Sequence, residues 1–410
     1  MFVEYFTMRL LFILFAFLIL LFSACEKLLP KAPAPEETLD GPMEGLTTEQ
    51  SIQFARGDEA FGEVFTPATG LGPIFVMSSC AGCHTGDGKG HPFATLTRFG
   101  QSDSTGNNYL MQGGPQLQHR AIPGFTPEVL PSGAPFSRFL PPAVAGIGFL
   151  AALSDAQILS YADPNDADGD GISGVPNYIT PPPYFVPGPY HIPQNGKYIG
   201  RFGRKAAAID LLIQTVNAYH QDIGITSIFE MVDPINFQVS GQGNDPIPDP
   251  EVSNSVINDV VFYLRTLKPP TPRNSSDPDV MAGKNIFTDI KCGKCHIPEW
   301  TTPQSDVAAL SNKTFYPYTD LLLHDMGPGL DDGYTEGSAK TSEWRTTPLW
   351  GLGLSKIAQG GQYFLMHDGR AKSLESAIML HGGEASDSKN LFQQLNSSDK
   401  AKLIKFLESL

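Results

Sequence analysis

The sequence predicts a mainly α fold with long irregular loops, organised as two similar domains in tandem. Three observations support this prediction. Apolar residues recur at helical spacing in several stretches, and glycine (41 residues) and proline (35 residues) concentrate between those stretches. One short cysteine–histidine motif also occurs twice. With 410 residues, 41% of them hydrophobic, the chain can form more than one core, since a domain commonly takes roughly 100–200 residues.

The N-terminus predicts export. The apolar run 10–22 follows Arg9 and is shorter than the about 20 residues of a spanning helix, but it suits the apolar core of a signal peptide. Small residues stand directly before Cys25, as in a bacterial lipobox, where the cysteine becomes the lipidated first residue. We expect a lipoprotein signal peptide over 1–24 and a flexible tether over 25–46. Lipidated Cys25 would anchor the exported protein in the periplasm or at the outer membrane of a Gram-negative bacterium. The alternative is an ordinary signal peptide or an uncleaved anchor.

The four cysteines after Cys25 all belong to the repeated motif. The two copies are Cys80-Ala-Gly-Cys83-His84 and Cys292-Gly-Lys-Cys295-His296. This spacing is typical of c-type haem attachment, because both thiols reach the vinyl groups of one porphyrin while the adjacent histidine lies beneath the iron. A disulfide explains the cysteines but not the histidines, and a zinc site needs no histidine after each pair. We therefore expect two covalently bound haem c groups.

Helical spacing surrounds each motif in the same order. Apolar residues predict a helix before each motif, over 52–61 and 280–287, and a helix that closes each unit, over 256–267 and 401–410. The proline-rich run 268–272 ends the helix predicted over 256–267. Ser397 or Ser398 would cap the last one.

Helix, haem motif, irregular loops and closing helix is the order of a cytochrome c domain. We therefore predict two cytochrome c-like haem domains in tandem, over 47–268 and 275–410, with a boundary near residue 270.

The segment 163–174 predicts a calcium loop inserted in the first domain. Asp166, Asp168 and Asp170 alternate before a tight glycine turn, which matches the first half of a calcium loop with the Ile172 carbonyl as the next ligand. Asn177 occupies the position at which an EF-hand has a bidentate glutamate, so we expect a shortened loop. A turn of aspartate and glycine without an ion is the alternative.

Taken together, these stretches resemble the dihaem oxidoreductase (putative peroxidase) family, formerly called thiol oxidoreductases and distantly similar to bacterial dihaem cytochrome c peroxidases. Beside the haem motifs and the calcium-type loop, the matching stretches are 72–75, 200–203, 222–227, 324–327, 343–346, 348–351, 367–370 and 381–384. One departure is Arg204, since the resemblance implies tryptophan after Arg201-Phe202-Gly203. A role for an aromatic side chain there in electron transfer between haems is therefore in doubt.

The resemblance also implies a sixth ligand for the second haem. His381 aligns with the methionine axial ligand of the peroxidases, and a haem with two histidine ligands has a lower potential than one with methionine. Met326, Met366 and His367 are the rival ligands, and a histidine in a surface turn is the alternative.

The first haem has no comparable candidate. His91, His119 and His220 lie in contexts typical of surface histidines, so we expect a first iron that is five-coordinate or holds an exchangeable ligand.

The segment 201–222 resembles the distal segment of the peroxidases, in which a glutamine precedes an acidic general base. Gln214 and Asp222 occupy the nearest positions. Cleavage of an O–O bond requires a base that takes the first proton and returns it to the leaving oxygen. Asp222 suits that role if burial raises its pKa, and Arg201 or Arg204 would stabilise developing charge. An amphipathic helix with solvated charges is the alternative.

We therefore expect an oxidoreductase that takes electrons from a small donor protein, a cytochrome or cupredoxin, through the second haem. Peroxide or another small oxidant would react at the first haem. The rival hypotheses are a non-enzymatic dihaem electron-transfer cytochrome and a surface lipoprotein that binds a metal or docks to a larger complex. The net charge of −15 favours solubility or a basic donor protein, and it argues against nucleic acid as a partner.

Overall fold

The computed structural model describes residues 34–410. The predicted signal peptide, Cys25 and the start of the predicted tether lie outside the described residues. Residues 39–410 form one compact unit, and 34–38 belong to a separate one. Leu39 and Met43 are buried in the larger unit, so it begins inside the range predicted as tether. Over residues 34–410, the structure contains no helix with the length and apolar character that crossing a membrane requires.

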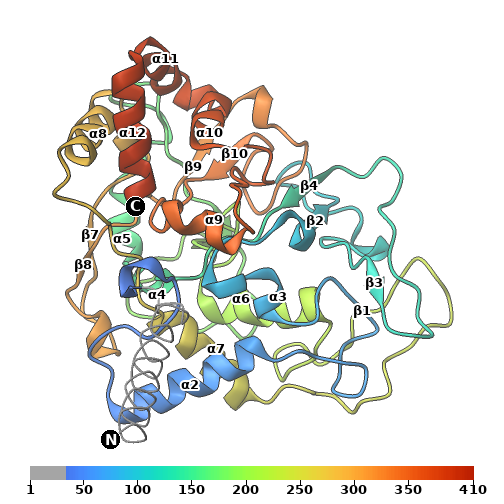
Figure 1. The fold of residues 1–410 in the computed structure, drawn as a ribbon. Coiled ribbons are helices and arrows are strands. Elements are labelled where there is room, and N and C mark those ends of the chain that lie inside the picture. The colour runs from blue at the N-terminus through green and yellow to red at the C-terminus, as the bar shows by residue number, and fades with distance from the viewer. Residues whose placement is uncertain (1–33) are drawn as a thin grey trace, which may run out of the picture. The chain divides into compact units, whose positions relative to one another are not determined.

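The larger unit is helical, with few short strands and long loops, which agrees with the mainly α prediction (Figure 1). Its α-helices are α2 (Thr48–Gly62), α3 (Cys80–Cys83), α4 (Ile147–Ala152), α5 (Asp155–Leu159), α6 (Leu211–Asn217), α7 (Asn254–Thr266), α8 (Pro278–Asp289), α9 (Ser355–Ala358), α10 (Leu374–Leu380), α11 (Ser386–Gln394) and α12 (Ser397–Ser409). A π-helix, η5 (Ala218–Ile223), continues α6. The remaining helical segments are single 3₁₀ turns, among them η6 (Cys292–Lys294).

The strands pair into five antiparallel two-stranded sheets. The pairs are β1 (Ile74–Phe75) with β3 (Arg120–Ala121), β2 (Leu96–Phe99) with β4 (Phe136–Phe139), β5 (Tyr178–Ile179) with β6 (Tyr198–Ile199), β7 (Trp300–Thr301) with β8 (Thr314–Phe315), and β9 (Leu323–Asp325) with β10 (Glu343–Arg345). These short ribbons stabilise the ends of the long loops.

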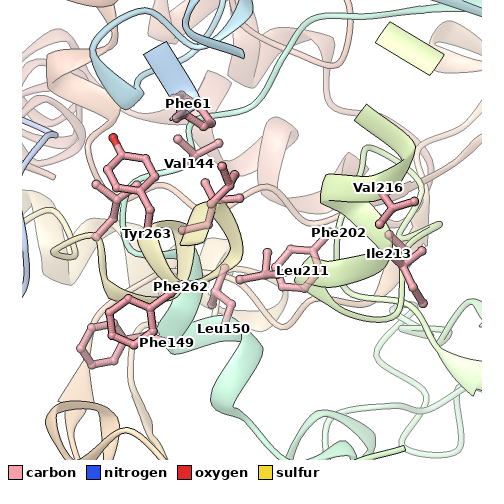
Figure 2. Packing of buried hydrophobic residues seen from close by; sticks show 14 of the residues in the cluster. Phe61, Val144, Phe149, Leu150, Phe202, Leu211, Ile213, Val216, Phe262 and Tyr263 are labelled. Carbon is pink, nitrogen blue, oxygen red and sulfur yellow. The ribbon is translucent and has the colours of Figure 1, made fainter. Parts of the chain in front are cut away.

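Helices α2 and α7 pack closely against each other in the first half of the chain. The contact depends on Gly57, because a methyl group at this position would lie 2.1 Å from the Asp259 carbonyl oxygen. Phe61 on α2 stacks near Tyr263 on α7, with ring centroids 5.3 Å apart. Figure 2 shows both rings in the large apolar core, which α4 and α6 complete. This core forms one side of the first haem motif.

Helices α8 and α12 form an equivalent pair in the second half. A methyl group on Gly283 would lie 2.1 Å from the Lys402 carbonyl oxygen, so glycine again permits the close approach. Phe287 packs against Phe406 with centroids 5.4 Å apart.

All the predicted helices form, with one correction at a cap. Asn396, rather than Ser397 or Ser398, caps α12, because its side-chain oxygen accepts a hydrogen bond from the Asp399 amide at 3.0 Å. The boundary predicted near residue 270 lies within the compact unit, and the division into tandem domains stays a prediction.

Candidate functional site

The first Cys-x-x-Cys-His motif forms a short helical turn. The Ser79 hydroxyl accepts a hydrogen bond from the Gly82 amide, and the His84 amide donates to the Cys80 carbonyl at 3.0 Å. His84 Nδ1 lies 2.8 Å from the Pro142 carbonyl oxygen, so the ring donates there and leaves Nε2 as an acceptor. Burial lowers the pKa of His84 to about 4, which keeps the ring neutral.

The second motif repeats this arrangement. The His296 amide donates to the Cys292 carbonyl at 3.0 Å, and His296 Nδ1 lies 2.9 Å from the Tyr318 carbonyl oxygen. Burial lowers the pKa of His296 to about 4 as well. In each half an aromatic ring of the first helix lies against the motif histidine, Phe61 against His84 and Phe287 against His296. Both histidines are therefore oriented as metal ligands.

None of the four motif cysteines forms a disulfide within residues 34–410. Burial raises the pKa of Cys80, Cys83 and Cys292 to about 12 and also raises that of Cys295. Thiols in such surroundings are poor nucleophiles, which argues against thiol chemistry as the function.

Each motif opens into its own apolar cavity. The cavity beside the first motif has a volume of about 230 Å³, and the cavity beside the second motif has a volume of about 200 Å³. Mainly apolar side chains line both cavities. Trp350 belongs to the first wall and Trp344 to the second.

Three buried cations line both cavities: Lys89, Arg204 and Arg345. Burial lowers their pKa values to about 7, about 9 and about 10. The two arginines donate to backbone carbonyls, and no carboxylate of residues 34–410 forms an ion pair with any of the three. Buried charges of one sign need a compensating partner. A haem supplies such charge through its two propionates, so the cavities, thiols, histidines and cations together fit a haem in each cavity.

The predicted distal residues lie in the first cavity. Gln214 on α6 and Asp222 on η5 both line it. Burial raises the pKa of Asp222 to about 6, and Gln116 Nε2 donates a hydrogen bond to its carboxylate. Arg98 lies beside them and donates to Gln221 Oε1 at 2.6 Å. This polar group can accept and return a proton inside a cavity whose lining is mainly apolar.

Arg201 also lines the first cavity, but its guanidinium is already engaged. It forms a buried ion pair with Asp155 and donates to the Ala151 carbonyl at 3.1 Å. Its charge is compensated where α4 passes into α5. Arg204, which forms no ion pair within residues 34–410, is therefore better placed than Arg201 to stabilise developing charge.

The second cavity contains His381 together with its rivals. His381 follows α10, and its Nδ1 lies 2.8 Å from the Ala377 carbonyl oxygen, which leaves Nε2 as an acceptor. His296, Met326 and Met366 line the same cavity. His367 lines it too, but its Nε2 lies 2.7 Å from Asp332 Oδ2 and its ring stacks on Trp344 with centroids 3.7 Å apart. His381 as the sixth ligand stays a prediction.

His91, His119 and His220 line neither cavity among the described residues. His220 Nε2 lies instead 2.9 Å from the Val232 carbonyl oxygen. That these three histidines are not ligands of the first haem stays a prediction.

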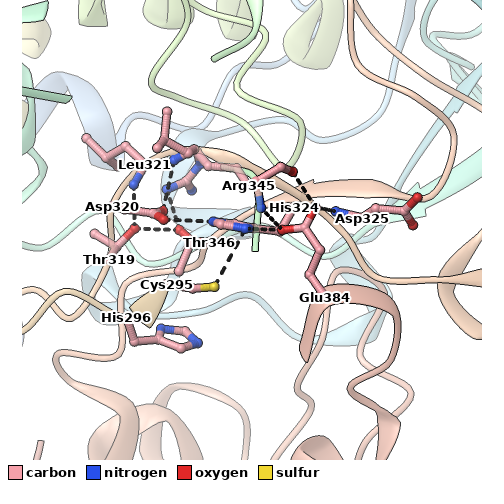
Figure 3. A network of polar contacts seen from close by, with 12 residues as sticks. Cys295, His296, Thr319, Asp320, Leu321, His324, Asp325, Arg345, Thr346 and Glu384 are labelled. Atoms are coloured by element: carbon pink, nitrogen blue, oxygen red, sulfur yellow. Dashed lines mark hydrogen bonds and ion pairs between the residues drawn. The ribbon is translucent and has the colours of Figure 1, made fainter. Parts of the chain in front are cut away.

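A buried polar network borders the second motif (Figure 3). His324 on β9 lies 2.7 Å from both Asp320 and Glu384 carboxylates, and 3.6 Å from Cys295 Sγ. Burial alone would lower the pKa of His324, but the two carboxylates outweigh it and hold that pKa well above its usual value. Glu384 also accepts from the Ser173 amide at 3.0 Å, so the network joins the calcium-type loop to the second cavity.

The calcium-type loop gathers part of its predicted ligand set. Oxygens of Asp163, Asp166 and Asp168 lie within 4.8 Å of one another. Asp170 instead forms an ion pair with Lys294 at 2.9 Å, and Ile172 lines the second cavity. Calcium in this loop stays a prediction.

The family model for di-haem oxidoreductase, putative peroxidase, matches residues 138–410. This chain belongs to that family. The match includes the second haem motif, the segment 201–222 and His381, and it begins after the first motif. The family establishes a haem-dependent redox protein, as the resemblance predicted.

Solved structures related to this di-haem oxidoreductase are distant. The hydrazine synthase of Kuenenia stuttgartiensis shares 14% identity at a TM-score of 0.36, with 93% of each chain covered. A MauG-like protein associated with microbial copper homeostasis shares 15% identity at a TM-score of 0.40, with 93% of this chain and 95% of that chain covered. No curated protein sequence matches the chain.

Several residues of this di-haem oxidoreductase site were missed by sequence reasoning. They are Lys89, Arg98, Gln116, Glu336 and Arg345, which line the first cavity from loops and strands far apart in the chain. Arg345 lies within the matched stretch 343–346 and Glu336 precedes that stretch, but nothing in their sequence context links them to a cavity around residue 84.

Proposed function

We propose that this chain is a dihaem c-type oxidoreductase with peroxidase-like activity. The observation that carries the proposal is the unequal set of side chains in the two cavities. Among the described residues that line the first cavity, His84 is the sole histidine and there is no methionine. The second cavity offers His296, His381 and two methionines. A haem bound in each cavity would supply a redox-active iron, with an open position expected only in the first.

The haem-binding residues follow from the two motifs. Cys80 and Cys83 would form thioethers to one haem and Cys292 and Cys295 to the other, in two tandem cytochrome c-like domains. His84 and His296 would be proximal ligands, and His381 the sixth ligand of the second haem. Lys89, Arg204 and Arg345 would neutralise propionates.

Asp222 would manage the proton in peroxide turnover. Its pKa of about 6 leaves most carboxyls ionised at neutral pH, so the group can take a proton from an incoming peroxide. The same value keeps the protonated form accessible, so the proton can return to the leaving oxygen. Gln116 fixes the carboxylate by hydrogen bonding, and Arg98 places a positive charge nearby.

Electrons would come from a small exported donor, a cytochrome or cupredoxin, through the second haem. The acidic net charge supports a donor with a basic surface. We further propose export and lipid anchoring through Cys25, based on the N-terminal sequence alone.

The test uses the full chain matured in a periplasm that attaches haem c. We expect its mass to include two haems and its resting ferric EPR spectrum to contain one high-spin and one low-spin component. We also expect turnover of hydrogen peroxide with a reduced small cytochrome. Two low-spin haems without peroxide turnover would instead support the electron-transfer cytochrome, and a protein without covalent haem would exclude both.

A further inference from the structure

A second group of acidic residues lies away from both cavities, in the segment 226–251 that follows η5. Asp233 and Asp245 are only 3% and 8% exposed, and Glu251 is half-buried. One carboxylate oxygen of each residue lies within 4.8 Å of the others. The chain has thus brought three acids together out of water.

Each of these carboxylates uses only one of its oxygens. Asp233 accepts from the Asp245 amide at 2.8 Å, Asp245 from the Ile247 amide at 2.7 Å, and Glu251 from the Thr226 amide at 2.7 Å. The other oxygens, Asp233 Oδ1, Asp245 Oδ2 and Glu251 Oε1, are buried without a hydrogen-bond partner. Buried polar oxygens are normally satisfied, so three such oxygens in one cluster indicate a missing partner.

A cation is the partner that three carboxylates so close together favour. Within residues 34–410, no lysine, arginine or histidine forms an ion pair with any of the three acids. One oxygen of each carboxylate lies within 4.8 Å of the others, a separation at which like charges repel. The three carboxylates therefore oppose one another's ionisation unless a cation lies between them.

We propose that Asp233, Asp245 and Glu251 bind a calcium ion. All three free donors are carboxylate oxygens, which are the ligands of hard cations, and soft transition metals prefer nitrogen or sulfur. Calcium takes about 6–8 oxygens and tolerates irregular geometry, so carbonyls and water can complete its shell. Gln242 Oε1 is another buried oxygen of the same segment without a hydrogen-bond partner.

The site is distinct from the loop over 163–174. In that loop Asp166 Oδ1 and Asp168 Oδ1 accept from backbone amides, Asp170 pairs with Lys294, and none of their carboxylate oxygens is buried without a partner. The 226–251 segment is therefore the stronger calcium site of the described residues.

Calcium here would stiffen the wall of the first cavity. Thr226 follows Asp222 closely in the chain, and both its amide and its hydroxyl donate to Glu251 Oε2. His220, in the same π-helix as Asp222, contacts the carbonyl of Val232 beside Asp233. A bound calcium ion would fix Asp233 and Glu251. Through the contacts of His220 and Thr226 it would also fix the π-helix η5, which carries Asp222. This consequence rests on the proposed function, whereas calcium binding itself does not.

The test uses holoprotein treated with EGTA, desalted, and titrated with CaCl₂ by calorimetry, with bound calcium measured by atomic emission. The variant D233N/D245N is compared with wild type and with a matched control at two exposed aspartates outside both acidic clusters, D103N/D289N. We expect the first variant to lose one bound calcium per chain and the control to retain it. Equal stoichiometry and affinity in D233N/D245N and wild type would overturn the proposal.

Thermal unfolding gives a second, independent readout. Calcium should raise the Tm of wild type and of the control but not that of D233N/D245N. Without calcium, D233N/D245N should have a higher Tm than wild type, because its amides remove the repulsion between the carboxylates. A wild-type Tm that does not respond to calcium would contradict the proposal. If the double variant does not fold, E251Q decides the question by the same titration, with loss of the calcium supporting the site and full retention refuting it. None of these readouts depends on peroxide turnover.

Discussion

Asp222 lies where its ionisation is unfavourable but still occurs near neutral pH. Burial raises its pKa from 3.8 to about 6, and the hydrogen bond from Gln116 and the charge of Arg98 limit that rise. A carboxyl group with a pKa near the working pH is the best compromise for giving and taking protons. The residue therefore combines the position and the acidity that proton transfer in the first cavity requires.

Replacing Asp222 by Asn should abolish most peroxide turnover. The amide cannot accept the proton, and general acid–base groups contribute roughly 10²–10⁴-fold in rate, so we expect kcat to fall by that factor. Stability should not fall, because the raised pKa means that the ionised carboxylate destabilises the fold as pH rises through about 6. Steady-state kinetics and thermal unfolding at pH 7.5 check both statements.

The pH dependence distinguishes chemistry from structure. Wild-type turnover should decrease as pH falls through about 6, where Asp222 becomes protonated, and D222N should lack this step. The exposed Asp103 provides the matched control, D103N, which should retain both the rate and the pH step. The same acid limb in D222N would show that another group carries the proton.

Replacing His381 by Ala should change one haem and leave the other intact. His381 and His296 line one cavity, and each donates its Nδ1 hydrogen to a carbonyl. Loss of the sixth ligand should convert the low-spin ferric signal to high-spin, as measured by EPR at low temperature. His119→Ala, at an exposed histidine outside both cavities, should keep the wild-type spectrum. An unchanged low-spin signal in H381A would assign the ligand to Met326 or Met366.

At the scale of elements, the helix pairs depend on two glycines. A methyl group on Gly57 or Gly283 would lie 2.1 Å from a backbone oxygen of the opposing helix, and backbone cannot move aside as a side chain can. We expect G57A and G283A each to destabilise the protein by about 1–3 kcal/mol, as overpacked core positions do. Urea unfolding of the holoprotein measures the change.

Gly62 supplies the control for this prediction. It is the last residue of α2, and a methyl group there meets nothing within 4 Å. Alanine should therefore stabilise α2 by about 0.5–1 kcal/mol through its greater helix propensity. If G57A were as stable as G62A, the two helices would not be in close contact at Gly57.

Helices that depend only on nearby residues could be predicted from the sequence. The residues that line the cavities could not. The spacing of Val256 to Leu267 predicts α7, since it depends only on residues within a few turns. Arg98 and Gln116 meet Asp222 only because β2 pairs with β4 and long loops return to η5, and no local pattern encodes such pairings. The π-helix at η5 also alters the side-chain direction that helical spacing predicts for Asp222.

At the scale of the molecule, the two halves share their cations. Lys89 and Arg204 come from the first half and Arg345 from the second, and each lines both cavities. Each half therefore completes the cavity of the other. The sequence predicts a boundary near residue 270 but does not show that cations from both sides of it line both cavities. Their lack of carboxylate partners becomes apparent only in the structure. Arg204, at the position where the family resemblance implies tryptophan, places a charge instead of a ring in the wall that the two cavities share.

Replacing Arg204 by Leu should therefore lower the reduction potentials of both haems. A positive charge beside a haem favours the reduced form, and removing it would leave a propionate without that partner, an effect on the order of 1–2 kcal/mol, or about 40–90 mV for one electron. Spectroelectrochemical titration of R204L at fixed ionic strength measures both potentials in one experiment. R138L, which removes an exposed arginine that lines neither cavity, should leave them close to wild type. A decrease at only one haem would show that Arg204 serves a single cavity, and the shared cationic wall would then be reduced to Lys89 and Arg345.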